Sequence, residues 1–191
     1  MNTNLVFKNI SKHITLQQHE KEYFEGMLQE VHLKKRSFLL RQGDPCHFIH
    51  FVNTGILRAY HQDENGKEST LMFASEDWWI TDMHCFLNQL PAMVNIQVVQ
   101  DCSLFKLSLS DLNELYKQVP FFNTFFRILM EKAYCREQLR TIQNLSIPAK
   151  ERYENFISKY PFIASAVPLK HIASYLGITP EFLSTIRAQR P

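Results

Sequence analysis

The sequence predicts an α+β protein with three parts: an N-terminal antiparallel β-roll of the jelly-roll type, a long central helix and a C-terminal all-α helix-turn-helix head. Two observations carry this prediction. Between residues 31 and 107, short runs rich in β-branched and aromatic residues alternate with turn signals. Before and after that region, apolar residues recur at helical spacing. We therefore expect the roll and its flanking helices over 1–119, the long helix over 120–147 and the head over 148–191.

Residues 1–30 are predicted to be helical, and Thr15 precedes a segment in which apolar residues recur at helical spacing. Seven or eight short strands are then expected, among them 38–40, 48–52, 56–60, 69–73, 94–98 and 104–107. A turn at 53–55 separates the second and third of these strands. Asn65 and Gly66 suit a hairpin whose central residues need positive φ.

The central helix is predicted from Pro120, after a shorter helix capped by Ser110, to about residue 145. No Gly or Pro interrupts this segment, so about 26 residues would span ~39 Å. Its apolar face predicts a contact with a second copy of the chain through Phe122, Phe126, Leu129, Met130 and Ala133. The alternative is that the helix simply covers the roll. Pro148 then ends or kinks it.

Residues 168–188 fit a helix-turn-helix. Ala173, Gly177 and Leu183 stand at the spacing of a first helix, a sharp turn and the inner face of a second helix. Thr179 is expected to cap that second helix, with Pro180 at its first position. The residues expected to face duplex DNA are Lys170, Thr179, Pro180, Glu181, Ser184, Thr185, Arg187 and Arg190. A helical hairpin that packs only its own core is the alternative.

Composition narrows the class of protein further. Hydrophobic residues make up 45% of the chain, which supports a sizeable core, and the net charge is only +2. Six Lys and Arg residues but three acidic residues lie in 148–191, which is compatible with DNA contact at that end. The four cysteines form no paired metal motif. No signal peptide or long apolar run is recognisable, so we expect a cytoplasmic protein without a membrane partner.

These parts together resemble the CRP/FNR family of bacterial transcription regulators, whose roll is a cyclic nucleotide-binding-like domain. The resemblance rests on the Arg-Gln-Gly-Asp-Pro turn at 41–45, the strand pair at 51–58, the long helix and the helix-turn-helix. Gly43 and Gly55 match turn glycines of the family's roll. The resemblance implies a homodimer that binds a roughly palindromic double-stranded DNA site near promoters, with RNA polymerase as a further partner. It also implies that a small-molecule effector in the roll shifts the DNA-binding heads.

The chain departs from the family at the cyclic nucleotide site. Relatives that bind cyclic AMP carry a Gly-Glu pair and then an Arg-Ser pair, where this sequence has Thr81-Asp82 and Ala92-Met93. The Asp82 carboxylate could still accept a hydrogen bond from a hydroxyl group, but Ala92 and Met93 cannot bind a phosphate. We therefore expect no response to cyclic AMP by the usual phosphate site. The residues expected to line the effector pocket are Trp79, Thr81, Asp82, Ala92 and Met93, and the effector itself is unknown.

No cofactor is expected. The oxygen-sensing branch of the family needs clustered N-terminal cysteines, and the first cysteine here is Cys46. His84 and Cys85 suit a surface histidine beside a core thiol better than haem ligands.

A second departure from the family is that the sequence stops soon after the recognition helix. This predicts a head without a β-hairpin wing, as in a truncated subgroup of the family.

Two other functions are alternatives to a DNA-binding regulator. The first is a small-molecule sensor whose degenerate head acts through a protein partner. The second is an enzyme of the cupin-like β-roll type, which needs clustered His and carboxylate ligands. His47 and His50 are three residues apart and would lie on opposite faces of a strand, so no catalytic or metal-binding residue is expected.

Overall fold

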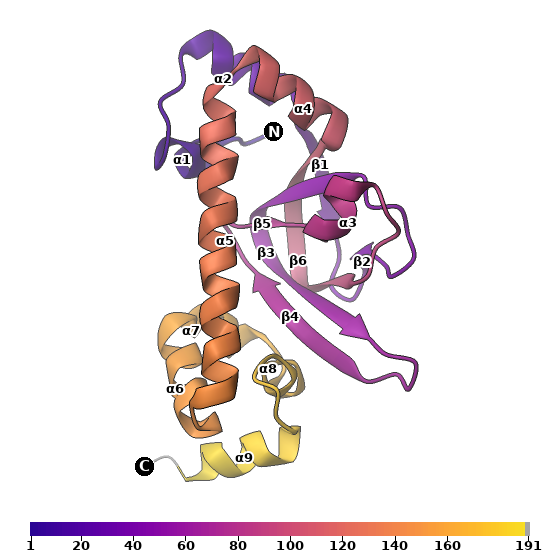
Figure 1. Cartoon of the computed structure of the whole chain (residues 1–191), viewed down its shortest axis with the longest axis vertical. Helices are drawn as coiled ribbons and strands as arrows, with labels where there is room; N and C mark the ends of the chain where they lie inside the picture. The colour runs from indigo at the N-terminus through magenta and orange to yellow at the C-terminus, as the bar shows by residue number, and fades with distance from the viewer. Residues whose placement is uncertain (190–191) are drawn as a thin grey trace.

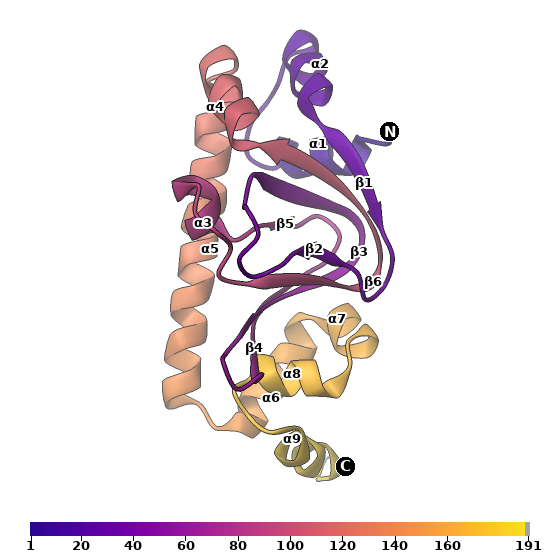
Figure 2. The same ribbon diagram turned by 90° about the vertical axis from the view of Figure 1, so that its right-hand side faces the viewer.

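The protein is an antiparallel β-roll flanked by helices, with a long helix running along it to a helical head. The computed structural model describes residues 1–189, and within them nine helices accompany a six-stranded sheet. Figure 1 and Figure 2 show the long helix α5 (Phe121–Ser146) passing beside the roll, from the end of the molecule where α2 and α4 lie to the head. The predicted α+β fold class is confirmed.

The other elements follow in chain order. Those of the N-terminal part are α1 (Asn4–Ser11), α2 (Gln18–Met27), β1 (Gln29–Leu33), β2 (Phe38–Leu40), β3 (Phe48–Gln62), β4 (Glu68–Ala74), β5 (Trp79–Ile80), α3 (Met83–Asn88), β6 (Asn95–Ser108) and α4 (Leu109–Gln118). The head consists of α6 (Ala149–Lys159), α7 (Pro161–Ala166), α8 (Leu169–Tyr175) and α9 (Pro180–Ala188).

The sheet is organised around one long antiparallel ribbon of β3 and β6. Its strand order is β1-β6-β3-β4, with β2 paired to β6 and β5 paired to β3. The ribbon pairs Phe48 with Ser108 at one end and Tyr60 with Asn95 at the other. The sequence predicted two short strands in each of these regions, and this is corrected by the structure: β3 and β6 are each continuous.

Gly55 explains why β3 can continue where a turn was expected. It lies inside the strand at a run of register shifts, with φ of +95°. A Cβ atom built there would lie 2.4 Å from the carbonyl oxygen of Asp101 and 2.6 Å from Cβ of Cys102. Only glycine permits both this φ and this approach of the two strands. Residues 53–55 therefore bend the ribbon instead of ending it.

Two further expectations differ in detail, and a third agrees. The N-terminal helical stretch is two helices, and residues 29–30 already belong to β1. Ser108, not Ser110, caps α4, because its Oγ accepts a hydrogen bond from the N–H of Asp111 at 3.0 Å. The long helix begins directly after Pro120, as predicted.

Apolar side chains form three clusters. One joins the N-terminal helices, α4 and the first turns of α5 to the roll, and includes Phe24, Phe51 and Phe122. The second fills the inside of the roll. The third is the core of the head, and Phe73 of the sheet belongs to it. The head is therefore packed against the roll through an apolar contact.

Gly55 offers a direct test of the bent ribbon. We expect Gly55→Ala to lower the free energy of unfolding by about 2 kcal/mol or more, because the added methyl group meets backbone atoms at a positive φ. Gly26→Ala is the matched control. Gly26 lies in α2 with no heavy atom within 4 Å of an added Cβ, so the change should stabilise by up to about 1 kcal/mol. Equal effects of the two substitutions in urea unfolding would contradict the register described here.

Candidate nucleic-acid interface

The helix-turn-helix is built as the sequence predicted. Gly177 turns the chain with φ of +68°, and the N–H of Ile178 returns to the carbonyl oxygen of Ala173 at 3.0 Å. Oγ1 of Thr179 accepts a hydrogen bond from the N–H of Phe182 and so caps α9. The side chains that join α8 to α9 are buried: Ile172, Ala173, Leu176, Leu183 and Ile186.

The opposite face of α9 is open to solvent. Figure 1 and Figure 2 place α9 at the end of the molecule, with α8 between it and the sheet. All of the residues expected to face DNA that the structure describes are exposed: Lys170, Thr179, Pro180, Glu181, Ser184, Thr185 and Arg187. Arg190 lies outside the described residues. A short helix with one buried and one exposed polar face at the edge of a domain is the form that a recognition helix needs.

The hydroxyl groups on this face have a defined direction. Oγ of Ser184 donates to the carbonyl oxygen of Pro180, and Oγ1 of Thr185 donates to that of Glu181. In this state both hydroxyl oxygens offer lone pairs to a partner, and so does the Glu181 carboxylate. Arg187 is the donor on the same face and makes no hydrogen bond or ion pair with another described residue. Within residues 1–189, the exposed face therefore carries several acceptors and one strong donor.

Sequence reasoning missed one residue of this surface. The ring of Phe182 is 51% exposed on α9, beside the polar groups. The sequence did hold a signal for this exposure, because Phe182 directly precedes Leu183, which was expected to face the core. An exposed aromatic ring can contact a thymine methyl group in a major groove.

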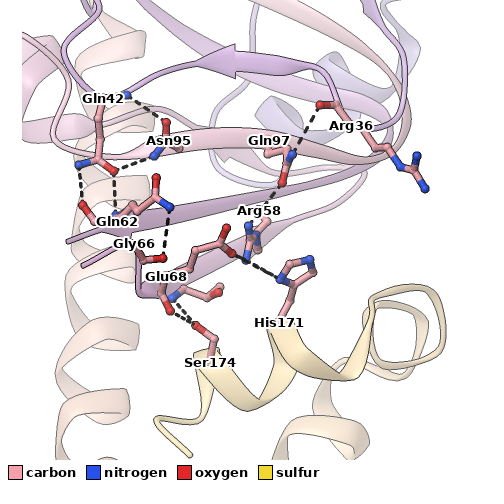
Figure 3. Close-up of polar contacts among 11 residues, drawn as sticks. Arg36, Gln42, Arg58, Gln62, Gly66, Glu68, Asn95, Gln97, His171 and Ser174 are labelled. Carbon is pink, nitrogen blue, oxygen red and sulfur yellow. Dashed lines mark hydrogen bonds and ion pairs between the residues drawn. The ribbon is translucent and has the colours of Figure 1, made fainter. Parts of the chain in front are cut away.

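A polar junction fixes α8 to the sheet. Figure 3 shows Arg58 of β3, Glu68 of β4 and His171 of α8 converging where the hairpin meets the head. The Arg58 guanidinium donates to the Glu68 carboxylate at 2.7 Å and to Nδ1 of His171. It also lies 3.9 Å from the centre of the Tyr60 ring. Arg58 is only 1% exposed, so its charge is held in place by these partners.

A second link runs through Ser174. Its Oγ donates to the carbonyl oxygen of Glu68 at 2.8 Å and accepts from the N–H of Thr70 at 2.9 Å. One serine thus satisfies two backbone groups at the edge of β4. Nothing in the sequence alone indicated this junction, because Arg58 and His171 are 113 residues apart.

The residues predicted to form a dimer interface lie against the roll of the same chain. Phe122 and Phe126 are 0% and 4% exposed and make edge-to-face ring contacts with Phe125 in the N-terminal core. Leu129, Met130 and Ala133 line a cavity between α5 and the roll. This part of α5 therefore matches the alternative that the helix covers the roll, and its solvent-exposed face carries other side chains.

Of the five residues predicted to line an effector pocket, two line a cavity and three do not. Trp79 and Thr81 line the same cavity, which has a volume of about 280 Å³. Asp82, Ala92 and Met93 are not among its lining residues. The Asp82 carboxylate accepts hydrogen bonds from the N–H groups of Cys85 and Met93, so both oxygens serve the backbone. Ala92 is buried, and the Met93 side chain is 56% exposed.

Among residues 1–189, His, Cys, Asp and Glu side chains do not gather in threes as a metal site would require. His50 is buried, and burial lowers its pKa to about 4, so it is neutral near pH 7. None of the helices described combines the length and the apolar character that a bilayer crossing needs.

Comparison with known proteins agrees with this architecture. Residues 30–119 match the family model of the cyclic nucleotide-binding domain. The chain is 26% identical over 89 residues to patatin-like phospholipase domain-containing protein 6 of Homo sapiens, which is 47% of this chain and 6% of that protein. It is 23% identical over 120 residues to protein 7 of the same name from Rattus norvegicus, 62% and 9% of the two chains. The chain thus spans less than a tenth of these relatives.

Solved structures of bacterial regulators share the fold over most of their length. One is the c-di-GMP responsive global regulator CLP of Xanthomonas campestris, with a TM-score of 0.71, 16% identity and 91% of each chain covered. Another is a transcriptional regulator of the crp/fnr family from Eubacterium rectale, with a TM-score of 0.70, 20% identity, and 90% and 82% covered. The predicted resemblance to CRP/FNR regulators is therefore confirmed for the fold.

The junction at His171 predicts a pH dependence of stability. Burial and the Arg58 charge lower the pKa of His171 from 6.5 to about 4. The unfolded chain therefore binds more protons than the folded chain between these values, and stability falls as the pH falls from 6.5 towards 4. Between pH 7 and pH 5, we expect the free energy of unfolding of His171→Asn to fall by about 2 kcal/mol less than that of the unmodified protein. Because the pKa of His50 is also lowered by burial, His50 contributes to the pH dependence of stability in both proteins. Parallel stability curves would contradict a neutral, docked His171.

Proposed function

We propose that this chain, which has the fold of the CRP/FNR transcription regulators, is a homodimeric regulator that binds DNA in a sequence-specific manner. The single observation that carries the proposal is the exposed polar face of α9 at the end of the molecule, backed by a buried helix-turn-helix core. The solved structures with the same fold include transcription regulators. Lys170 and Arg187 supply positive charge for phosphates or a guanine, and the oxygens of Glu181, Ser184 and Thr185 suit base amino groups.

The acceptor-rich face favours particular bases. Cytosine N4 and adenine N6 present hydrogen-bond donors in the major groove, whereas guanine presents acceptors there. With the hydroxyl hydrogens of Ser184 and Thr185 directed to their own helix, these oxygens match the amino groups. The Arg187 guanidinium matches guanine O6 and N7 or a phosphate.

Dimerisation is proposed along the solvent-exposed face of α5. Phe121, Ile128, Cys135 and Ile142 recur at intervals of seven residues, and Leu139 and Leu145 lie beside them. Leu139, Ile142 and Leu145 are 52–84% exposed, although they are large and apolar. A seven-residue apolar repeat is the pattern of two helices that wrap around each other. We name these six residues the α5 stripe.

Cyclic AMP is not the proposed effector. The groups that would hold its phosphate are replaced by Ala92 and Met93, and the Asp82 carboxylate already binds two backbone N–H groups. An anion placed beside Asp82 would meet a like charge without a compensating cation.

DNA binding is tested with a randomised duplex pool selected on the whole protein, followed by fluorescence anisotropy on the enriched sequence. We expect Arg187→Ala to weaken binding about tenfold or more, because it removes the donor of the exposed face. Lys8→Ala removes an exposed cation from α1 and is the matched control, with no expected change. If no sequence is enriched and no duplex binds at low salt, the head does not read DNA, and a sensor that acts through a protein partner becomes the better account.

The dimer is tested through Cys135. It is the exposed thiol on the α5 stripe, whereas Cys46, Cys85 and Cys102 are buried. In a two-fold parallel pair each Cys135 lies opposite its own copy, so mild oxidation should give a covalent dimer that Cys135→Ser abolishes. Ile142→Asp should give monomers in sedimentation, whereas Thr141→Asp, on the neighbouring exposed position, should not. A dimer that survives Ile142→Asp and resists oxidation would place the interface elsewhere.

A further inference from the structure

The cavity between α5 and the roll has apolar walls. Trp78, Ile80 and Met72 come from the sheet side, and Leu129, Met130 and Ala133 come from α5. Its volume of about 280 Å³ is at the small end of the range of ligand pockets in proteins. A compact apolar group fits these walls, and a large polar molecule does not.

Two cations stand on the α5 side of this cavity. Lys132 and Arg136 are four residues apart, so they are neighbours on one helix face and repel each other. The described contact of the Lys132 ammonium is Nε2 of His13 at 3.1 Å, which carries no negative charge. Burial and the neighbouring lysines lower the pKa of His13, which keeps this ring neutral near pH 7.

The carboxylates near these cations are shared with other cations. Asp77, which also lines the cavity, is bound by Lys12 and by the Asn9 amide. The nearest carboxylate oxygen of Glu137 is 3.7 Å from Arg136, and the other oxygen accepts from Arg140 at 3.0 Å. The cavity edge on α5 therefore has an excess of positive charge over the negative charge available to it within the described residues.

We propose that this cavity binds a small amphipathic carboxylate, with its apolar body between the tryptophans and α5 and its carboxylate on Lys132 and Arg136. Charge complementarity selects an anion, and a guanidinium beside an ammonium suits a carboxylate. The apolar walls select an aliphatic or aromatic body. This site stands independently of the proposed DNA binding, because no residue of α8 or α9 lines it.

The chain has its own reporter for this site. It contains two tryptophans, Trp78 and Trp79, and both line the cavity. The indole of Trp79 donates to the Asn9 side chain at 3.1 Å, and the Trp78 ring lies 5.3 Å from the Arg136 guanidinium. A ligand between them and α5 must change their surroundings, so intrinsic tryptophan fluorescence measures occupancy of the cavity directly.

The experiment titrates the whole protein with octanoate, octan-1-ol and octylammonium, which share one apolar body and differ in charge. We expect a saturable change in tryptophan fluorescence with octanoate, about tenfold weaker binding of octanol, and no saturation with octylammonium. Lys132→Ala and Arg136→Ala should each weaken octanoate binding about five- to tenfold. Lys117→Ala, an exposed cation on α4, should leave it unchanged.

A volume variant separates the cavity from the surface. Ala133→Phe fills space next to the tryptophans and should abolish octanoate binding, while the unfolding transition shows that the variant is folded. The proposal is overturned if octanoate gives no saturable signal, if octanol binds as tightly as octanoate, or if Lys132→Ala and Arg136→Ala leave the affinity unchanged. DNA binding is measured separately, so failure here leaves the proposed function standing.

Discussion

The contact between the β3–β4 hairpin and α8 sets the position of α9, the helix that we propose to bind DNA. A guanidinium that is almost fully buried binds a carboxylate of β4 and the neutral ring of His171 on α8, and Ser174 binds the backbone of the hairpin beside it. Phe73 of the same hairpin packs against Phe156 and Tyr175 of the head. Because α9 is packed on α8, a movement of the hairpin must move the exposed face of α9 as well. The roll can therefore influence the head through direct contact.

The long helix connects the other features. One face of α5 is buried in the N-terminal core, the middle of that face borders the cavity, and the far end reaches the head. The opposite face carries the α5 stripe. A ligand in the cavity, a second copy on the stripe and the docked head would all act on one rigid element. In the proposed dimer, this arrangement gives a physical route from occupancy of the cavity to the relative placement of the two α9 helices.

The helix-turn-helix could be predicted residue by residue because its signals are local. The Gly177 turn, the Thr179 cap and the inner apolar positions lie within 20 residues of each other. The long ribbon could not, because Gly55 looks like a turn residue until its close approach to Asp101 and Cys102 is known. The helical spacing of apolar residues also did not decide which side of α5 packs against the roll. Apolar residues occur on both of its sides, and only the packing shows that Phe122 and Phe126 face inward. The cavity is lined by residues of α1, the sheet and α5, which are far apart in the sequence. The sequence alone therefore could not predict that Lys132 and Arg136 lie at its edge.

The most direct test of the account is a hydroxyl-radical footprint of the whole protein on a duplex selected for binding. If two copies present their α9 helices from a two-fold pair, two protected segments should appear, centred one helical turn of DNA apart, about 10 base pairs, or a multiple of that distance. Their sequences should be related by inversion. A single protected segment, or protection spread evenly along the duplex, would contradict the paired recognition helices on which the account rests.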